Sequence, residues 1–94
     1  MKIKAGTQEH KNCFCREFLD THKPFIPEEL EWPVLSNYTV EKLKSFPIWD
    51  YAVFIETRVS LKLLAYAKVV DDPLIREAIA LQGYEEGRHA DILR

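Results

Sequence analysis

The sequence predicts an all-α protein in two parts, an N-terminal extension (residues 1–46) and an antiparallel helical hairpin (residues 47–94). From residue 47 onward, apolar residues recur at spacings of three and four over about five turns, the period of one helix face. Asp71-Asp72-Pro73 then interrupts the pattern, and a second helical pattern continues to the last residue. A connection this short makes consecutive helices antiparallel neighbours.

The composition is that of a small globular domain. Of the 94 residues, 47% are hydrophobic and 30% are charged. A domain of this size buries only about 60–65% of the surface that its unfolded chain exposes, so a partner subunit or a metal would add stability. The net charge is −2 and acidic residues are interspersed with the lysines, which argues against nucleic acid as a partner.

No export or membrane signal is expected. Residues 6–9 are Gly-Thr-Gln-Glu rather than the start of an apolar run, so the sequence predicts no secretory signal. The most apolar stretch, residues 46–70, is interrupted by charged side chains and is unsuited to spanning a membrane. Cys13 and Cys15 would point to different sides of a helix, which favours reduced, packed thiols. We therefore expect a cytoplasmic protein without a membrane partner.

The extension is expected to contain little long regular structure. Residues 7–22 predict a short amphipathic helix with Thr7 as its N-cap. Four of the five prolines lie between residues 24 and 47, which leaves room only for a short helix at 39–45 capped by Thr39. Large aromatic side chains are expected to fold this segment back onto the hairpin: Phe25, Trp32, Phe46 and Trp49.

The first long helix contains a carboxylate beside its apolar face. That face is predicted from the apolar positions Ala52, Ile55, Val59, Leu63, Tyr66 and Val70. Glu56 lies next to it, and a carboxylate in an apolar stripe must be paired, protonated or bound to a cation. The structural alternatives are a salt bridge from Glu56 to Arg88 or another cation, or a rotation of the stripe that leaves Glu56 at its border.

The second helix, from about residue 73 with Asp71 or Asp72 as its N-cap, contains Glu86-Gly87-Arg88-His89. Positions three apart share a helix face, so the carboxylate of Glu86 and the imidazole of His89 can reach one ion. The adjacent Glu85 is excluded because only Glu86 stands three residues before the histidine. Alone, this motif is weakly specific, and a packed core histidine is the alternative.

Glu56 and Glu86 are expected at about the same distance from the turn along the axis of the hairpin. Glu56 lies about 16 residues before Asp72 and Glu86 about 14 after it, so each is roughly 20–24 Å from the turn. In an antiparallel hairpin, Glu56 would therefore face Glu86 and His89 across the helix contact. The sequence predicts a metal site formed by these three residues.

This pattern resembles the first half of the ferritin-like di-iron carboxylate proteins. The resemblance rests on Glu56 and the Glu-x-x-His of residues 86–89, within ETRVSLKLLAYAK and YEEGRHADILR, and it covers about residues 47–94. It implies that Glu56 is a terminal ligand of one iron, Glu86 a bridging carboxylate and His89 a terminal nitrogen ligand. Manganese would fit the same ligands. It also implies an oxidoreductase that activates dioxygen or peroxide, although the sequence assigns no catalytic residue.

A complete centre of that kind needs a second Glu and a second Glu-x-x-His, and no such motif follows His89. Either two chains associate as a symmetric dimer, or the chain is the leading half of a longer four-helix bundle. The alternative to metal binding is a helical interaction or assembly module whose polar cluster fixes the register between subunits.

Overall fold

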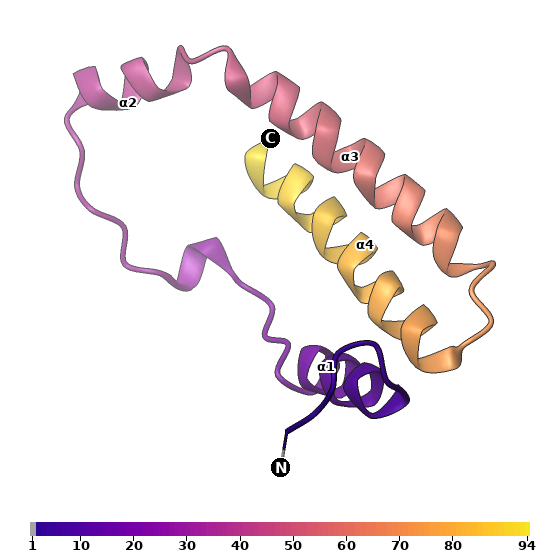
Figure 1. Cartoon of the computed structure of the whole chain (residues 1–94). Coiled ribbons are helices and arrows are strands. Elements are labelled where there is room, and N and C mark those ends of the chain that lie inside the picture. The colour runs from indigo at the N-terminus through magenta and orange to yellow at the C-terminus, as the bar shows by residue number, and fades with distance from the viewer. Residues whose placement is uncertain (1) are drawn as a thin grey trace.

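A computed structural model describes residues 2–94, and all regular structure in that part of the chain is helical, which confirms the predicted all-α class (Figure 1). Helices α3 and α4 run antiparallel side by side, and α1 lies across the end of α4 nearest the turn. Among residues 2–94, no helix has the length and apolar character that a membrane crossing needs. The elements in chain order are α1 (Gln8–Asp20), a 3₁₀ turn η1 (Pro27–Glu29), α2 (Asn37–Lys44), α3 (Ile48–Ala67) and α4 (Pro73–Leu93).

Asp72 determines both the start of α4 and the position of α1. Its side chain accepts hydrogen bonds from the backbone N–H groups of Leu74 (2.9 Å) and Ile75 (3.2 Å), and Pro73 occupies the first turn. The Lys11 ammonium of α1 donates to the same carboxylate at 2.5 Å. These contacts, that of Lys11 foremost, hold the pKa of Asp72 below its ordinary value. One residue therefore caps α4 and fastens α1 to it.

Small residues form the contact between α3 and α4. Ser60 and Ala67 of α3 are buried, as are Gly83 and Ala90 of α4. The Ser60 hydroxyl donates a 2.7 Å hydrogen bond to the Gly83 carbonyl oxygen, across the helix contact. This bond fixes the height of one helix against the other.

The glycines of α4 are needed for this close approach. A Cβ at Gly83 would lie 3.0 Å from Cγ of Leu64 and 3.1 Å from Cβ of Leu63. A Cβ at Gly87 would lie 3.0 Å from Oγ of Ser60. Close packing against α3 therefore explains why glycine occupies helix-interior positions where it costs about 0.5–1 kcal/mol relative to alanine.

The face of α3 that contacts α4 matches the predicted apolar face only in part: Leu63 lies against Gly83, whereas other predicted positions are exposed. Ile55, Val59 and Tyr66 remain 38%, 36% and 58% exposed, whereas Ser60 and Ala67 are buried against α4. Apolar periodicity identifies a face suited to burial but does not say which neighbour covers it. In this chain the closest contact is set by small residues, and part of the apolar stripe lies on the neighbouring flank of α3.

The N-terminal helix agrees with its prediction, and α2 differs in its cap. Thr7 caps α1 by accepting a hydrogen bond from the His10 N–H at 3.1 Å. Cys15 is buried and Cys13 is exposed, so one thiol packs. The predicted cap Thr39 is wrong, because α2 begins earlier and Ser36 accepts from the Thr39 N–H at 3.2 Å.

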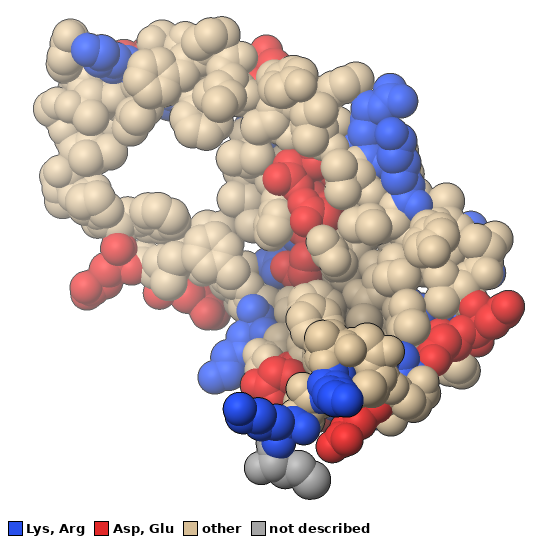
Figure 2. Space-filling model, viewed as in Figure 1, with Lys and Arg blue, Asp and Glu red and all other residues tan. Residues whose placement is uncertain are grey.

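The aromatic side chains of the segment between α1 and α3 do not pack onto the hairpin, so the predicted aromatic cap is wrong. Between α1 and α3 the chain forms an arch, and Figures 1 and 2 show open space between this arch and the hairpin. The two indole N–H groups bond locally, Trp32 to the Pro27 carbonyl at 2.7 Å and Trp49 to that of Leu43 at 2.6 Å. The side chains expected to pack are 37–62% exposed: Phe25, Trp32, Phe46 and Trp49.

The chain is extended for its length. Its radius of gyration is 17.7 Å, whereas a compact chain of 94 residues has about 12 Å. Within residues 2–94 the buried hydrophobic residues are small, namely Cys15, Ala67 and Ala90, and no large side chain is fully buried. The apolar side chains that would normally form a core are therefore largely on the surface.

Gly83→Ala is expected to lower the free energy of unfolding by on the order of 1 kcal/mol. Overpacking against Leu63 and Leu64 costs about 1–3 kcal/mol and outweighs the gain in helix propensity of about 1 kcal/mol. Urea denaturation followed by circular dichroism measures the change. Glu77→Ala, at an exposed position of the same helix, is the control and should stay within about 0.5 kcal/mol of the wild type. A Gly83→Ala protein more stable than the wild type would contradict the packing described here.

Candidate metal centre

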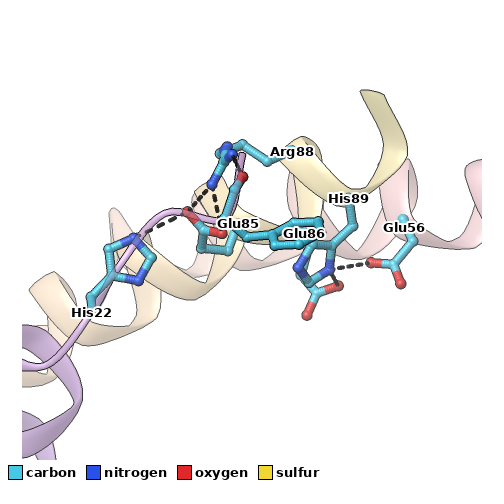
Figure 3. Close-up of polar contacts among 7 residues, drawn as sticks. His22, Glu56, Glu85, Glu86, Arg88 and His89 are labelled. Atoms are coloured by element: carbon cyan, nitrogen blue, oxygen red, sulfur yellow. Dashed lines mark hydrogen bonds and ion pairs between the residues drawn. The ribbon is translucent and has the colours of Figure 1, made fainter. Parts of the chain in front are cut away.

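The three residues predicted as metal ligands lie together across the contact of α3 and α4. In Figure 3 the side chains of Glu56, from α3, and of Glu86 and His89, from α4, point toward one another. Nδ1 of His89 is 3.6 Å from Oε2 of Glu56 and 3.5 Å from Oε2 of Glu86. One ligand atom from each residue lies within 4.8 Å of the other two. The predicted convergence of the three side chains is present in the structure.

The register that brings them together comes from the helix contact beside the cluster. Ser60 lies one turn after Glu56 on α3, and its hydroxyl bonds the carbonyl of Gly83, one turn before Glu86. Gly87, next to Glu86, faces the Ser60 hydroxyl as well. A slip of α4 by one turn would move Glu86 and His89 by about 5.4 Å relative to Glu56 and separate the ligands.

The cluster is partly removed from water. The side chains of Glu56 and Glu86 are 28% and 21% exposed, and that of His89 is 49% exposed. Oε2 of Glu56 is itself buried and has no hydrogen-bond partner within the described residues. A buried carboxylate oxygen without a partner is costly, so this atom is available to a proton or a cation.

The Glu86 carboxylate perturbs the titration of Glu56. The hydrogen bond that Glu56 can share with Glu86, together with burial and the negative charge of Glu86, raises the pKa of Glu56 above its ordinary value. His89 acts in the opposite direction and offsets part of this rise. The proximity of two carboxylates in a half-buried place therefore favours the binding of positive charge between them.

A second polar group lies beside the cluster and takes no part in it. The Glu85 carboxylate contacts Nε2 of His22 at 3.2 Å and the Arg88 guanidinium at 3.3 Å (Figure 3). Arg88 also donates to the Phe25 carbonyl oxygen. Arg88 therefore fastens the extension to α4 and does not pair with Glu56, so the predicted alternative of a salt bridge to Arg88 is wrong; the positively charged group nearest Glu56 would be a protonated His89. Sequence spacing gave no signal for these contacts, because His22 and Phe25 are about 63 residues from their partners.

The donor atoms suit a divalent transition metal. Two carboxylates and one imidazole nitrogen form a mixed oxygen and nitrogen set that iron(II) and manganese(II) accept. Two carboxylates also neutralise the charge of one divalent ion. Three protein ligands leave further coordination positions for other groups.

Comparison with known protein families, with curated proteins and with solved structures gives no match. The assignment of this cluster therefore rests on its own geometry and donor chemistry.

The metal-free protein is expected to become more stable as the pH falls from 8 toward 5, and Glu56→Gln should remove part of that gain. A carboxyl whose pKa is raised on folding destabilises the fold above its folded-state pKa, and the effect disappears as pH falls toward its ordinary value of 4.5. Asp72, with its lowered pKa, acts in the opposite sense, with stability lost at low pH. The difference in the free energy of unfolding between the wild type and Glu56→Gln, followed across pH, isolates the contribution of the Glu56 carboxyl.

Urea denaturation across this pH range, with a chelator present, measures the difference. The Glu56→Gln protein should be the more stable of the two at pH 8, and the two should converge toward pH 5. If the free energies of unfolding of the two proteins changed with pH in parallel, folding would not shift the pKa of Glu56.

Proposed function

We propose that this chain binds iron or manganese through Glu56, Glu86 and His89, as one half of a ferritin-like di-metal carboxylate centre. The observation that supports this most directly is the convergence of the three ligand atoms within 4.8 Å, around a buried Glu56 oxygen that has no hydrogen-bond partner within the described residues. We propose that the protein is an oxidoreductase that uses dioxygen or peroxide.

The proposed roles follow from the positions of the side chains. A pair of redox-active ions would supply electrons to dioxygen or peroxide. Glu86 lies beside both His89 and Glu56, which suits a bridging carboxylate. Glu56 and His89 reach the site from opposite helices, so both helices must stay in register to bind an ion. Ile55 and Val59, next to Glu56, would keep water from the site once their flank is covered.

The three side chains provide the ligands of half a two-ion site. The remaining ligands would come from a second helix pair placed against the first, supplied by a second chain or by further sequence. Covering the site would also strengthen every electrostatic interaction within it.

A metal-free assembly module explains the cluster less well. In that case the polar residues would serve only to set the register between helices. Ser60 and Gly83 already set that register with a buried hydrogen bond. The half-buried carboxylate of Glu56, whose pKa is raised by the neighbouring Glu86, would add cost without adding specificity.

Metal binding is tested with two adjacent glutamates. The wild-type chain should bind about one Mn²⁺ or Fe²⁺, and Glu86→Ala should weaken binding by at least about tenfold, because it removes a ligand. Glu85→Ala is the matched control, since its carboxylate belongs to the neighbouring group with His22 and Arg88. Anaerobic titration calorimetry with metal analysis of the desalted protein provides the measurement.

Equal loss of binding in the Glu85→Ala and Glu86→Ala proteins would indicate non-specific attraction to acidic surface. No binding by the wild type would favour the metal-free assembly module.

A further inference from the structure

The flank of α3 that bears Glu56 presents an apolar surface without a covering neighbour. Relative to Glu56, Val59 and Ile55 lie roughly 60° and 100° around the helix, on the side away from Ser60. Ile55 and Val59 are 38% and 36% exposed, and Ile48 on the same side is 56% exposed. The regular spacing of these residues is that of a buried helix face, yet in the single chain they contact water.

The surface area of the whole chain indicates how much is uncovered. The chain exposes 7854 Å², whereas a compact monomer of 11.0 kDa exposes about 5,600 Å². The excess of about 2,200 Å² includes the surface of the open arch between α1 and α3 as well as the flank of α3, and it is within the range of about 1,000–2,500 Å² that one chain of an obligate homodimer buries.

Part of the ligand-bearing side is already covered. Helix α1 packs on α4 near the turn, where Cys15 and Phe18 lie against Ile75, Ile79 and Gln82. The half of the hairpin that contains the cluster is free of α1. Figure 2 shows acidic side chains gathered over the middle of the hairpin, at the border of the open space. The uncovered area therefore includes the half of the hairpin that holds the proposed ligands.

We infer that a second copy of this chain covers the flank formed by Ile48, Ile55 and Val59, with a two-fold axis beside the ligand cluster. Each copy then contributes Glu56, Glu86 and His89 to one site shared by both chains. This inference rests on the proposed function and names the partner that completes it.

Symmetry and charge both favour a second copy of the chain as the partner that covers this flank of α3. A two-fold contact places the same apolar stripe of each chain against its counterpart and brings the two ligand sets together. The four carboxylates brought together repel one another in the absence of metal. Two divalent ions neutralise them and supply a bond network across the axis. Assembly and metal binding therefore stabilise each other, because the ions bind the dimer more tightly than the separate chains.

Native mass spectrometry of the full chain, with chelator and after anaerobic Mn²⁺ loading, tests the inference. The loaded protein is expected at about 22 kDa, twice the chain mass of 11.0 kDa, with two ions per dimer. Chelation should shift the equilibrium toward the monomer. The electron paramagnetic resonance spectrum of the loaded dimer should show two coupled Mn²⁺ ions rather than isolated ones.

Two lysine substitutions on opposite flanks of α3 locate the interface. Ile55→Lys should convert the loaded protein to a monomer, whereas Leu61→Lys should remain a dimer. Leu61 is 65% exposed on the other flank, and both positions are exposed enough for the single chain to keep its fold. Circular dichroism verifies that both variants keep the helix content of the wild type.

The outcomes separate this inference from the proposed function. A loaded wild-type monomer with one ion per chain would overturn the shared site and leave metal binding intact. A dimer that binds no metal would overturn the shared site together with the proposed function. A dimer broken by Leu61→Lys and kept by Ile55→Lys would place the interface on the other flank and contradict the inference.

Discussion

The close contact of α3 with α4 at Ser60, Gly83 and Gly87 sets the height of each helix relative to the other. A glycine carbonyl accepts the Ser60 hydroxyl, and side chains larger than hydrogen at the glycine positions would push the helices apart. One turn away along each helix, that fixed height brings Glu56 level with Glu86 and His89. The site therefore depends on a contact made by small residues rather than by a large apolar core.

The carboxylates of Glu56 and Glu86 lie close together, and a bound cation would neutralise their negative charge. Glu56 has a buried oxygen without a hydrogen-bond partner within residues 2–94, and the adjacent Glu86 raises its pKa. The same flank of α3 exposes apolar side chains that belong in an interior. Burying that flank around bound ions would relieve both conditions, since it removes apolar surface from water and neutralises the carboxylates. We therefore regard assembly and metal binding as coupled.

Much of the fold and the geometry of the candidate site could be predicted from the sequence, because both depend on local rules. Helix period, Pro73 after two aspartates and the similar distances of Glu56 and Glu86 from the turn define a hairpin and its register. The face of α3 that contacts α4 was predicted only in part, because the small residues Ser60 and Ala67 are buried there while part of the apolar stripe stays exposed. The open arch, the contact of Arg88 with Phe25 and that of Glu85 with His22 depend on tertiary packing that has no local signature.

The central claim is that Glu56, Glu86 and His89 bind a metal ion between α3 and α4. X-ray absorption at the manganese edge of Mn²⁺-loaded protein tests it most directly. We expect a shell of oxygen and nitrogen ligands that includes one imidazole per ion, with the imidazole signal lost in His89→Gln. In a shared two-ion site, a second metal would also appear at about 3.5–4 Å. A shell of oxygen ligands alone, unchanged in His89→Gln, would contradict the account and indicate an ion bound loosely to surface carboxylates.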